Sequence, residues 1–122
     1  MNTDQVENLL LNVVNHLSRE HYVKYGRFQE DEKVFHWFDI ENWEYSWKEP
    51  LTFDGRTIEK AEFDTGGEGH GEDVYMVFKT VDVDGTEQYW RKDGYYSSYG
   101  GTDWDGDFRE VRPVERTVVF YE

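Results

Sequence analysis

The sequence predicts an α+β protein in which an N-terminal amphipathic helix packs on a mainly antiparallel β-sheet. Two observations carry this prediction. Residues 1–25 have one apolar stripe at helical spacing, and residues 74–122 place valines and aromatic residues between Asp-Gly turns. The chain has 122 residues, of which 18% are aromatic. This length suits a single domain, 1–122, with a sizeable core.

The helix is expected over residues 1–25. Asn2 or Thr3 can cap its first turn, and Gly26 is expected to end it. Its apolar residues recur at spacings of three and four, as on one helical face. They are Val6, Leu9, Leu10, Val13, Val14 and Leu17. We expect this stripe to pack on the sheet rather than in the groove of a partner.

The middle segment, residues 26–73, mixes acidic and aromatic side chains. Alternation predicts one strand over residues 34–38 and another over residues 43–47. An Asp54-Gly55 hairpin and a strand over residues 57–65 follow. The glycine-rich stretch 66–72 is expected to be a loop, because it has too few side chains to pack.

The last segment, residues 74–122, is strongly β in character. Two predicted strands flank a second Asp-Gly hairpin at residues 84–85, and Asp93-Gly94 predicts a third turn. One or two strands are expected to close the sheet after residue 107. Pro113 marks an edge, a bulge or a bend in them, since proline cannot donate to a strand ladder.

Charge limits the classes of partner. The chain has 27 acidic and 13 basic residues, a net charge of −14, and residues 26–73 carry −9 of it. Such a chain repels nucleic acids and anionic membranes and is attracted to basic surfaces. It has no cysteine, which excludes disulfides and thiolate metal sites. No signal peptide and no membrane-spanning run are recognisable, so cytoplasmic residence is expected.

Two acidic patterns are weak candidates for metal binding. The spacing of the first resembles the start of a calcium loop, but its glycine, Gly106, falls at the fourth position and Val114 stands at the twelfth, where that loop has an acid, which favours an ordinary turn. Its residues are Asp103, Asp105 and Asp107. The second alternates along the glycine-rich stretch, a poor scaffold for a preorganised site. Its residues are Glu68, His70 and Glu72.

Nothing in the sequence indicates catalysis. Ser97-Ser98 lies in no nucleophile motif, and no glycine-rich phosphate loop opens a helix. We therefore expect neither an enzyme nor a cofactor. A different kind of site is suggested by the stretch from residue 94 to 108, whose aromatic side chains form a lip suited to a small neutral ligand. The lip residues are Tyr95, Tyr96, Tyr99 and Trp104.

The C-terminal half contains a tyrosine-rich turn, an Asp-Gly turn, the sequence EVRPVE and a valine-rich ending. In these features residues 66–122 resemble small, acidic, uncharacterised proteins encoded by bacteriophages. The resemblance implies phage origin and residence in the host cytoplasm, and it brings no catalytic residues. Small acidic phage proteins often disarm host proteins that bind nucleic acid, among them restriction enzymes and CRISPR effectors.

The leading hypothesis is a non-enzymatic inhibitor of a host defence protein, such as a CRISPR effector or a restriction-type nuclease. Its carboxylates would imitate DNA phosphates and occupy a basic channel. One alternative is a small-ligand binding or sequestering module that uses the lip. Another is a cation-stabilised structural protein of the virion, centred on the aspartates at 103, 105 and 107.

The partner in the leading hypothesis is a basic, nucleic-acid-binding host protein, with no direct contact to nucleic acid or membrane. Trp43 or Trp47 would anchor the centre of that interface, as buried aromatic side chains commonly do. Both a monomer and a homodimer are compatible with the sequence. The expected partner-binding residues are Glu30, Asp31, Glu32, Asp39, Glu41, Trp43, Glu44, Trp47, Glu59, Glu62 and Asp64.

Overall fold

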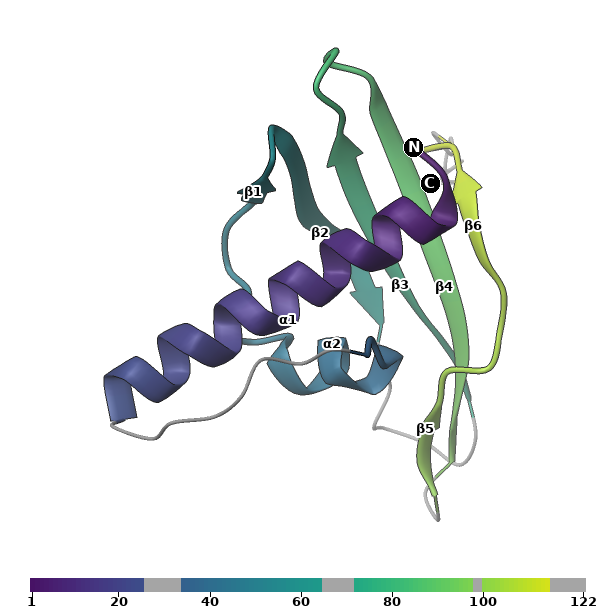
Figure 1. The fold of residues 1–122 in the computed structure, drawn as a ribbon. Helices are drawn as coiled ribbons and strands as arrows, with labels where there is room; N and C mark the ends of the chain where they lie inside the picture. Colours follow the sequence, from purple (N-terminus) through teal and green to yellow (C-terminus); the bar gives the residue numbers. More distant parts are fainter. Residues whose placement is uncertain (26–33, 65–71, 98–99, 115–122) are drawn as a thin grey trace, which may run out of the picture.

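The computed structural model describes residues 1–25, 34–64, 72–97 and 100–114 (Figure 1). Two helices lie on one face of a curled antiparallel sheet, which confirms the predicted α+β class. The sheet runs β1-β2-β3-β4, and β4 then pairs with β5 through one half and with β6 through the other. The elements are α1 (Thr3–Tyr25), α2 (Trp37–Trp43), β1 (Leu51–Phe53), β2 (Arg56–Asp64), β3 (Glu72–Val81), β4 (Glu87–Ser97), β5 (Gly101–Asp103) and β6 (Phe108–Val111).

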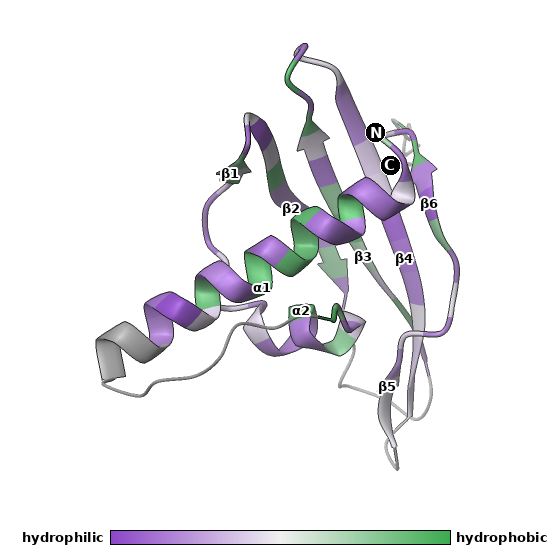
Figure 2. Cartoon of the chain, viewed as in Figure 1, coloured by the Kyte–Doolittle hydropathy of each residue, from purple (hydrophilic) through white to green (hydrophobic). Residues whose placement is uncertain are grey.

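The long helix α1 forms where it was predicted. Asn2 caps it, because its Oδ1 accepts a hydrogen bond from the backbone N–H of Gln5 and its own backbone N–H donates one to Gln5 Oε1, both at 2.9 Å. All six residues of the apolar stripe are buried. Figure 2 shows the apolar side of α1 turned toward the sheet that it crosses. The predicted packing of this helix on the sheet is confirmed.

The predicted strands over residues 34–38 and 43–47 are wrong. Residues 37–43 instead form the short helix α2, and a turn follows at 44–46. Trp37, Ile40 and Trp43 are spaced three residues apart, so a helix turns all three toward the core, where Ile40 is fully buried. Over so short a segment, the same pattern of aromatic and acidic residues fits a strand as well as a helix. Tertiary packing decides between the helix and the strand.

Two of the three predicted Asp-Gly turns are present. Asp54 and Gly55 both have positive φ, 52° and 80°, as a tight hairpin between β1 and β2 requires. Gly85, with φ 86°, lies in the hairpin between β3 and β4. The third prediction is wrong, because β4 continues straight through Asp93 and Gly94.

Gly94 serves close packing instead. A Cβ atom at this position would lie 2.5 Å from Cε3 of Trp104 and 2.9 Å from the carbonyl oxygen of Asp103. The glycine therefore lets the segment after β5 approach β4 closely, and the indole ring fills the space that a side chain would occupy. This close approach lets the indole Nε1 of Trp104 reach Glu41 of α2.

Substitution of Gly94 tests this close approach. We expect Gly94→Ala to lower the free energy of unfolding by about 1–3 kcal/mol, because the added methyl group overpacks the site. The measurement is urea denaturation followed by far-UV circular dichroism. Gly100→Ala is the matched control: its Cβ would meet only Ser97 Oγ, at 3.5 Å. Equal stability of the two variants would contradict the packing role of Gly94.

Beyond β6 the described chain ends at Val114, and Pro113 follows the strand without joining it, at the point where the sequence predicted an edge or bend. The remainder of the predicted closing strands lies outside the described residues. The same holds for the predicted helix stop at Gly26 and for residues 66–71 of the glycine-rich stretch, whose last residue, Glu72, begins β3. Neither of the two helices in the described part of the chain is long and apolar enough to cross a membrane.

Candidate functional site

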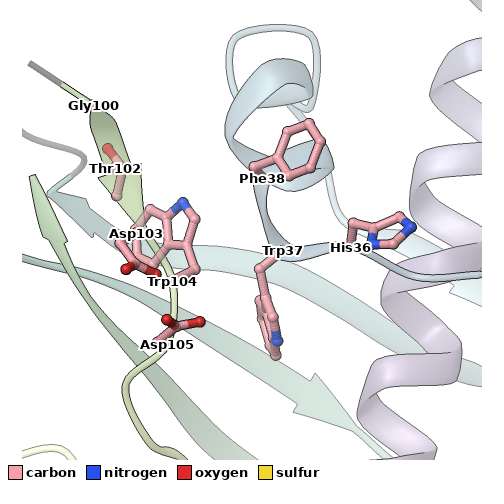
Figure 3. Close-up of a pocket in the computed structure, with 8 residues that line it drawn as sticks. All are labelled: His36, Trp37, Phe38, Gly100, Thr102, Asp103, Trp104 and Asp105. Carbon is pink, nitrogen blue, oxygen red and sulfur yellow. The ribbon is translucent and has the colours of Figure 1, made fainter.

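A pocket of about 410 Å³ lies between the start of α2 and the segment that contains β5 (Figure 3). The helix side contributes three rings, and the strand side contributes a hydroxyl, two carboxylates and an indole. Figure 3 shows Trp37 and Trp104 in the space between the helix and the strand, with the carboxylates of Asp103 and Asp105 on the strand side. The pocket thus combines aromatic surface with negative charge.

Glu41 holds the two sides of the pocket together. Its Oε2 accepts a hydrogen bond of 2.9 Å from the indole Nε1 of Trp104, and its Oε1 accepts one of 3.2 Å from the hydroxyl of Thr102. Trp104 is 7% exposed, so this partner satisfies a buried donor. Glu41 was expected to contact a partner protein. The structure instead commits both its carboxylate oxygens to joining α2 with β5.

The aromatic side of the pocket is held by the core. The Trp37 ring packs against Phe108 and Phe35, with centroids 4.6 and 4.9 Å away, and the Lys92 ammonium lies 5.1 Å from its centroid. Phe38, in contrast, is 54% exposed. A fixed indole and an exposed phenyl ring at one rim provide a surface on which a cation can stack.

Asp103 and Asp105 form a carboxylate pair on the exposed rim. A hydrogen bond to Asp105, partial desolvation and the negative charge of Asp105 together raise the pKa of Asp103 above its ordinary value. When both groups are ionised they repel each other. A guanidinium or ammonium group placed between them would relieve that repulsion.

Asp105→Asn tests the pair through the pH dependence of stability. A carboxyl whose pKa is raised on folding contributes stability below its unfolded pKa, and that contribution is lost as the pH rises through the folded pKa. We therefore expect the variant to be more stable than the wild type at pH 7, with no such gain at pH 3. Urea denaturation across this range measures the difference, and NMR titration should find a lower pKa at Asp103.

Asp84→Asn is the control of opposite sign. A backbone hydrogen bond from Thr86 lowers the pKa of Asp84, so its carboxylate stabilises the fold above its unfolded pKa and that stability is lost on acidification. This variant should lose stability at pH 7. If both substitutions shift stability in the same direction, the repulsive pair is not present.

The expected partner-binding residues do not form one surface. Glu30, Asp31 and Glu32 lie outside the described residues. Asp39, Glu41, Trp43 and Glu44 lie in or beside α2, whereas Glu59, Glu62 and Asp64 belong to β2. Trp47 is 2% exposed and belongs to the core.

The β2 acids point away from the helices and have partners within the fold. Glu62 accepts a hydrogen bond of 2.6 Å from the Tyr75 hydroxyl, and Glu59 lies 3.9 Å from the Lys79 ammonium. The register pairs Asp64 with Tyr75 on the same face. The sequence predicted one acidic surface, whereas the strand pairing divides these acids between two faces.

The predicted aromatic lip is also divided. Tyr95 is 51% exposed on the sheet face away from the helices, Tyr96 packs against the core, and Trp104 is buried. Tyr99 lies outside the described residues. His36, Trp37 and Phe38 were not predicted as pocket residues. The three-residue spacing of Trp37 and Ile40 was the signal that could have indicated a helix presenting them.

The metal candidates gain no support from the geometry. Within residues 1–25, 34–64, 72–97 and 100–114, no three histidine, aspartate or glutamate side chains converge as metal ligands, and the aspartates at 103, 105 and 107 are included in that statement. Asp107 belongs to the connection from β5 to β6, where its carbonyl oxygen accepts a hydrogen bond of 3.0 Å from the N–H of Asp93. Glu68 and His70 lie outside the described residues.

Comparison with models of known protein families, with curated proteins and with solved structures finds no match.

Proposed function

We propose that this protein is a non-enzymatic binding protein that inhibits a basic, nucleic-acid-binding partner. Its carboxylates would occupy the positions at which that partner binds the phosphates of nucleic acid. The observation that supports the proposal best is the Asp103–Asp105 pair at the rim of an aromatic pocket. Two ionised carboxylates held together at a surface repel each other and lower the free energy of unfolding, and a bound cation offsets this loss.

The distribution of basic residues supports the same function. Most basic side chains on the sheet are already engaged: Arg56 with Asp82 at 3.0 Å, Lys79 with Glu87 at 3.2 Å, and Lys92 with the carbonyl oxygen of Gly106. The pocket lining within the described residues has no lysine or arginine. With a net charge of −14, this end of the molecule presents a negative field to a partner.

An arginine of the partner is the group that fits the pocket best. A guanidinium is planar, donates hydrogen bonds to two carboxylates and stacks on aromatic rings. Phe38 and Trp37 supply the rings, and Asp105 supplies an acceptor at the rim. Asp103, which the register pairs with Tyr95, adds its negative charge from the strand edge. Arginine-rich channels are typical of proteins that hold nucleic acid. In keeping with the phage-like C-terminal sequence, we propose a host defence protein of this class as the partner and the host cytoplasm as the place of action.

A small cationic ligand is the second candidate. A volume of about 410 Å³ falls within the size range of small-molecule sites, and the same rings and carboxylates would bind an amine or a quaternary ammonium group. This candidate keeps the earlier idea of a sequestering module but moves it from the tyrosine lip to the pocket beside Trp104.

An affinity capture experiment distinguishes the two. The tagged protein is incubated with host lysate, washed at low and then at high salt, and challenged with duplex DNA. Retention of a nucleic-acid-binding protein that both salt and DNA release supports the DNA-mimic function. The DNA-mimic function is contradicted if DNA does not release the retained protein, or if no protein is retained. Mass spectrometry under native conditions would then test the small-ligand candidate.

A further inference from the structure

The sheet face turned away from α1 has a second groove, of about 620 Å³. Strands β2, β3, β4 and β6 form its floor, and residues 112–114 form one rim. Three arginines line it: Arg91, Arg109 and Arg112. In a chain with a net charge of −14, this is a local reversal of sign. The groove is separate from the α2–β5 pocket and needs its own explanation.

One carboxylate positions two of these arginines. Asp93 Oδ1 accepts a hydrogen bond of 2.7 Å from Arg91 Nε, and its Oδ2 accepts one of 2.6 Å from Arg109 Nη1. Strand pairing puts Arg91 directly opposite Arg109, where two like charges would otherwise repel. Although partial burial opposes the shift, the hydrogen bonds from Arg109 and Arg91 lower the pKa of Asp93 and keep it ionised.

This arrangement leaves donors available. Each guanidinium has five N–H groups, and Asp93 engages one on each side chain by the bonds above. Arg112 makes no ion pair with any residue that the structure describes. Two fixed guanidiniums and a third at the rim form a suitable receptor for a phosphate, which guanidinium groups bind through paired hydrogen bonds.

The groove also has a flat, partly apolar section. Arg91 lies over the ring of Tyr75, 4.2 Å from its centroid, and Tyr75 is fixed by its hydrogen bond to Glu62. Next to it, the Tyr89 ring and Val111 are paired across β4 and β6 and are only partly exposed. An aromatic ring of a ligand can stack here beside the arginines.

We infer that this groove binds a phosphate monoester attached to a planar aromatic group, the chemistry of a nucleoside monophosphate. The arginines bind the phosphate, and Tyr89 with Val111 receives the ring. The volume lies within the range of small-molecule sites. Two acids lie at the groove: Glu62 lines it and accepts the Tyr75 hydroxyl, and Asp93 is held between Arg91 and Arg109. More distant acids oppose an anion only weakly, because charges more than about 8 Å apart are largely screened at physiological salt. The inference does not depend on the proposed function of the α2–β5 pocket.

The test is calorimetric titration of the full-length protein with AMP, with adenosine and with inorganic phosphate. We expect saturable binding of AMP and at least about tenfold weaker binding of adenosine and of phosphate, since each supplies only part of the contacts. Arg112→Gln should weaken AMP binding by about tenfold. Lys48→Gln removes one exposed positive charge away from the groove and should leave binding unchanged.

Tyr89→Ala separates the two parts of the site: it should weaken AMP binding and leave phosphate binding as it was. The inference is overturned if AMP does not bind at millimolar concentration, or if the Lys48 and Arg112 variants lose affinity equally. It is also overturned if the groove is covered by a second copy of the chain. Sedimentation would then show a dimer that Arg112→Gln dissociates and AMP does not.

Discussion

Reversal of both Asp103 and Asp105 to lysine is expected to abolish binding of an arginine-rich partner. Both side chains are exposed, and neither holds the fold together through a hydrogen bond to another element, so the variant should remain folded. Loss of a close charge pair at an interface costs about 2–5 kcal/mol, or roughly 30-fold to several thousand-fold in affinity. Binding is measured by titration with an oligoarginine peptide, with tryptophan fluorescence as the readout.

The control has the same change in net charge at a distance from the pocket. Glu20 and Glu49 are exposed and lie outside the pocket lining. Glu20 pairs with His16 in α1, an exposed contact of little energetic value. Glu20→Lys combined with Glu49→Lys should weaken binding only slightly, through the general field. If the two double variants lose affinity equally, the total charge carries the interaction and the pocket does not.

Salt gives a second check on the same pair of variants. Attraction between exposed charges falls with ionic strength, because the screening length shortens from about 10 Å at 0.1 M to about 3 Å at 1 M. Binding by the wild type should therefore weaken steeply with added salt. The remaining affinity of the Asp103 and Asp105 variant should depend on salt much less.

The long helix and the hairpins could be predicted because their signals are local. The stripe from Val6 to Leu17 extends over several helical turns, and Asp54-Gly55 specifies its turn through backbone conformation alone. α2 has seven residues, too few for a period of 3.6 to be distinguished from alternation. At Asp93-Gly94 the same dipeptide that signals a turn elsewhere serves the packing of Trp104.

The pocket could not be predicted, because its parts are distant in the sequence. Glu41 binds Thr102 and Trp104 across separations of 61 and 63 residues. Composition showed that acids were abundant, but only the fold shows that Glu62 faces away from α2, through strand pairing, and that Asp105 lies in the pocket beside α2. The sequence also could not show which tryptophans were exposed, since both core and interface use them.

Trp47→Ala is expected to be among the most destabilising substitutions in this protein. The Trp47 ring is stacked on Phe78 with centroids 5.9 Å apart, meets Phe63 at 6.5 Å, and donates its Nε1–H to the carbonyl oxygen of Glu49 at 3.0 Å. Truncation of a buried tryptophan costs about 3–5 kcal/mol. That is a large share of the roughly 5–15 kcal/mol by which native proteins are stable. Urea denaturation measures the loss.

Tyr45→Ala supplies the contrast, because Tyr45 is 80% exposed only two residues away and should change stability by less than about 0.5 kcal/mol. The pair of variants decides what Trp47 does. If Trp47 is a core residue, its truncation to alanine should lower the unfolding midpoint strongly. The opposite outcome is that Trp47→Ala keeps the wild-type unfolding midpoint and loses only its binding to the partner protein. Trp47 would then anchor an interface, as the sequence alone suggested, and would not be buried beside Phe78.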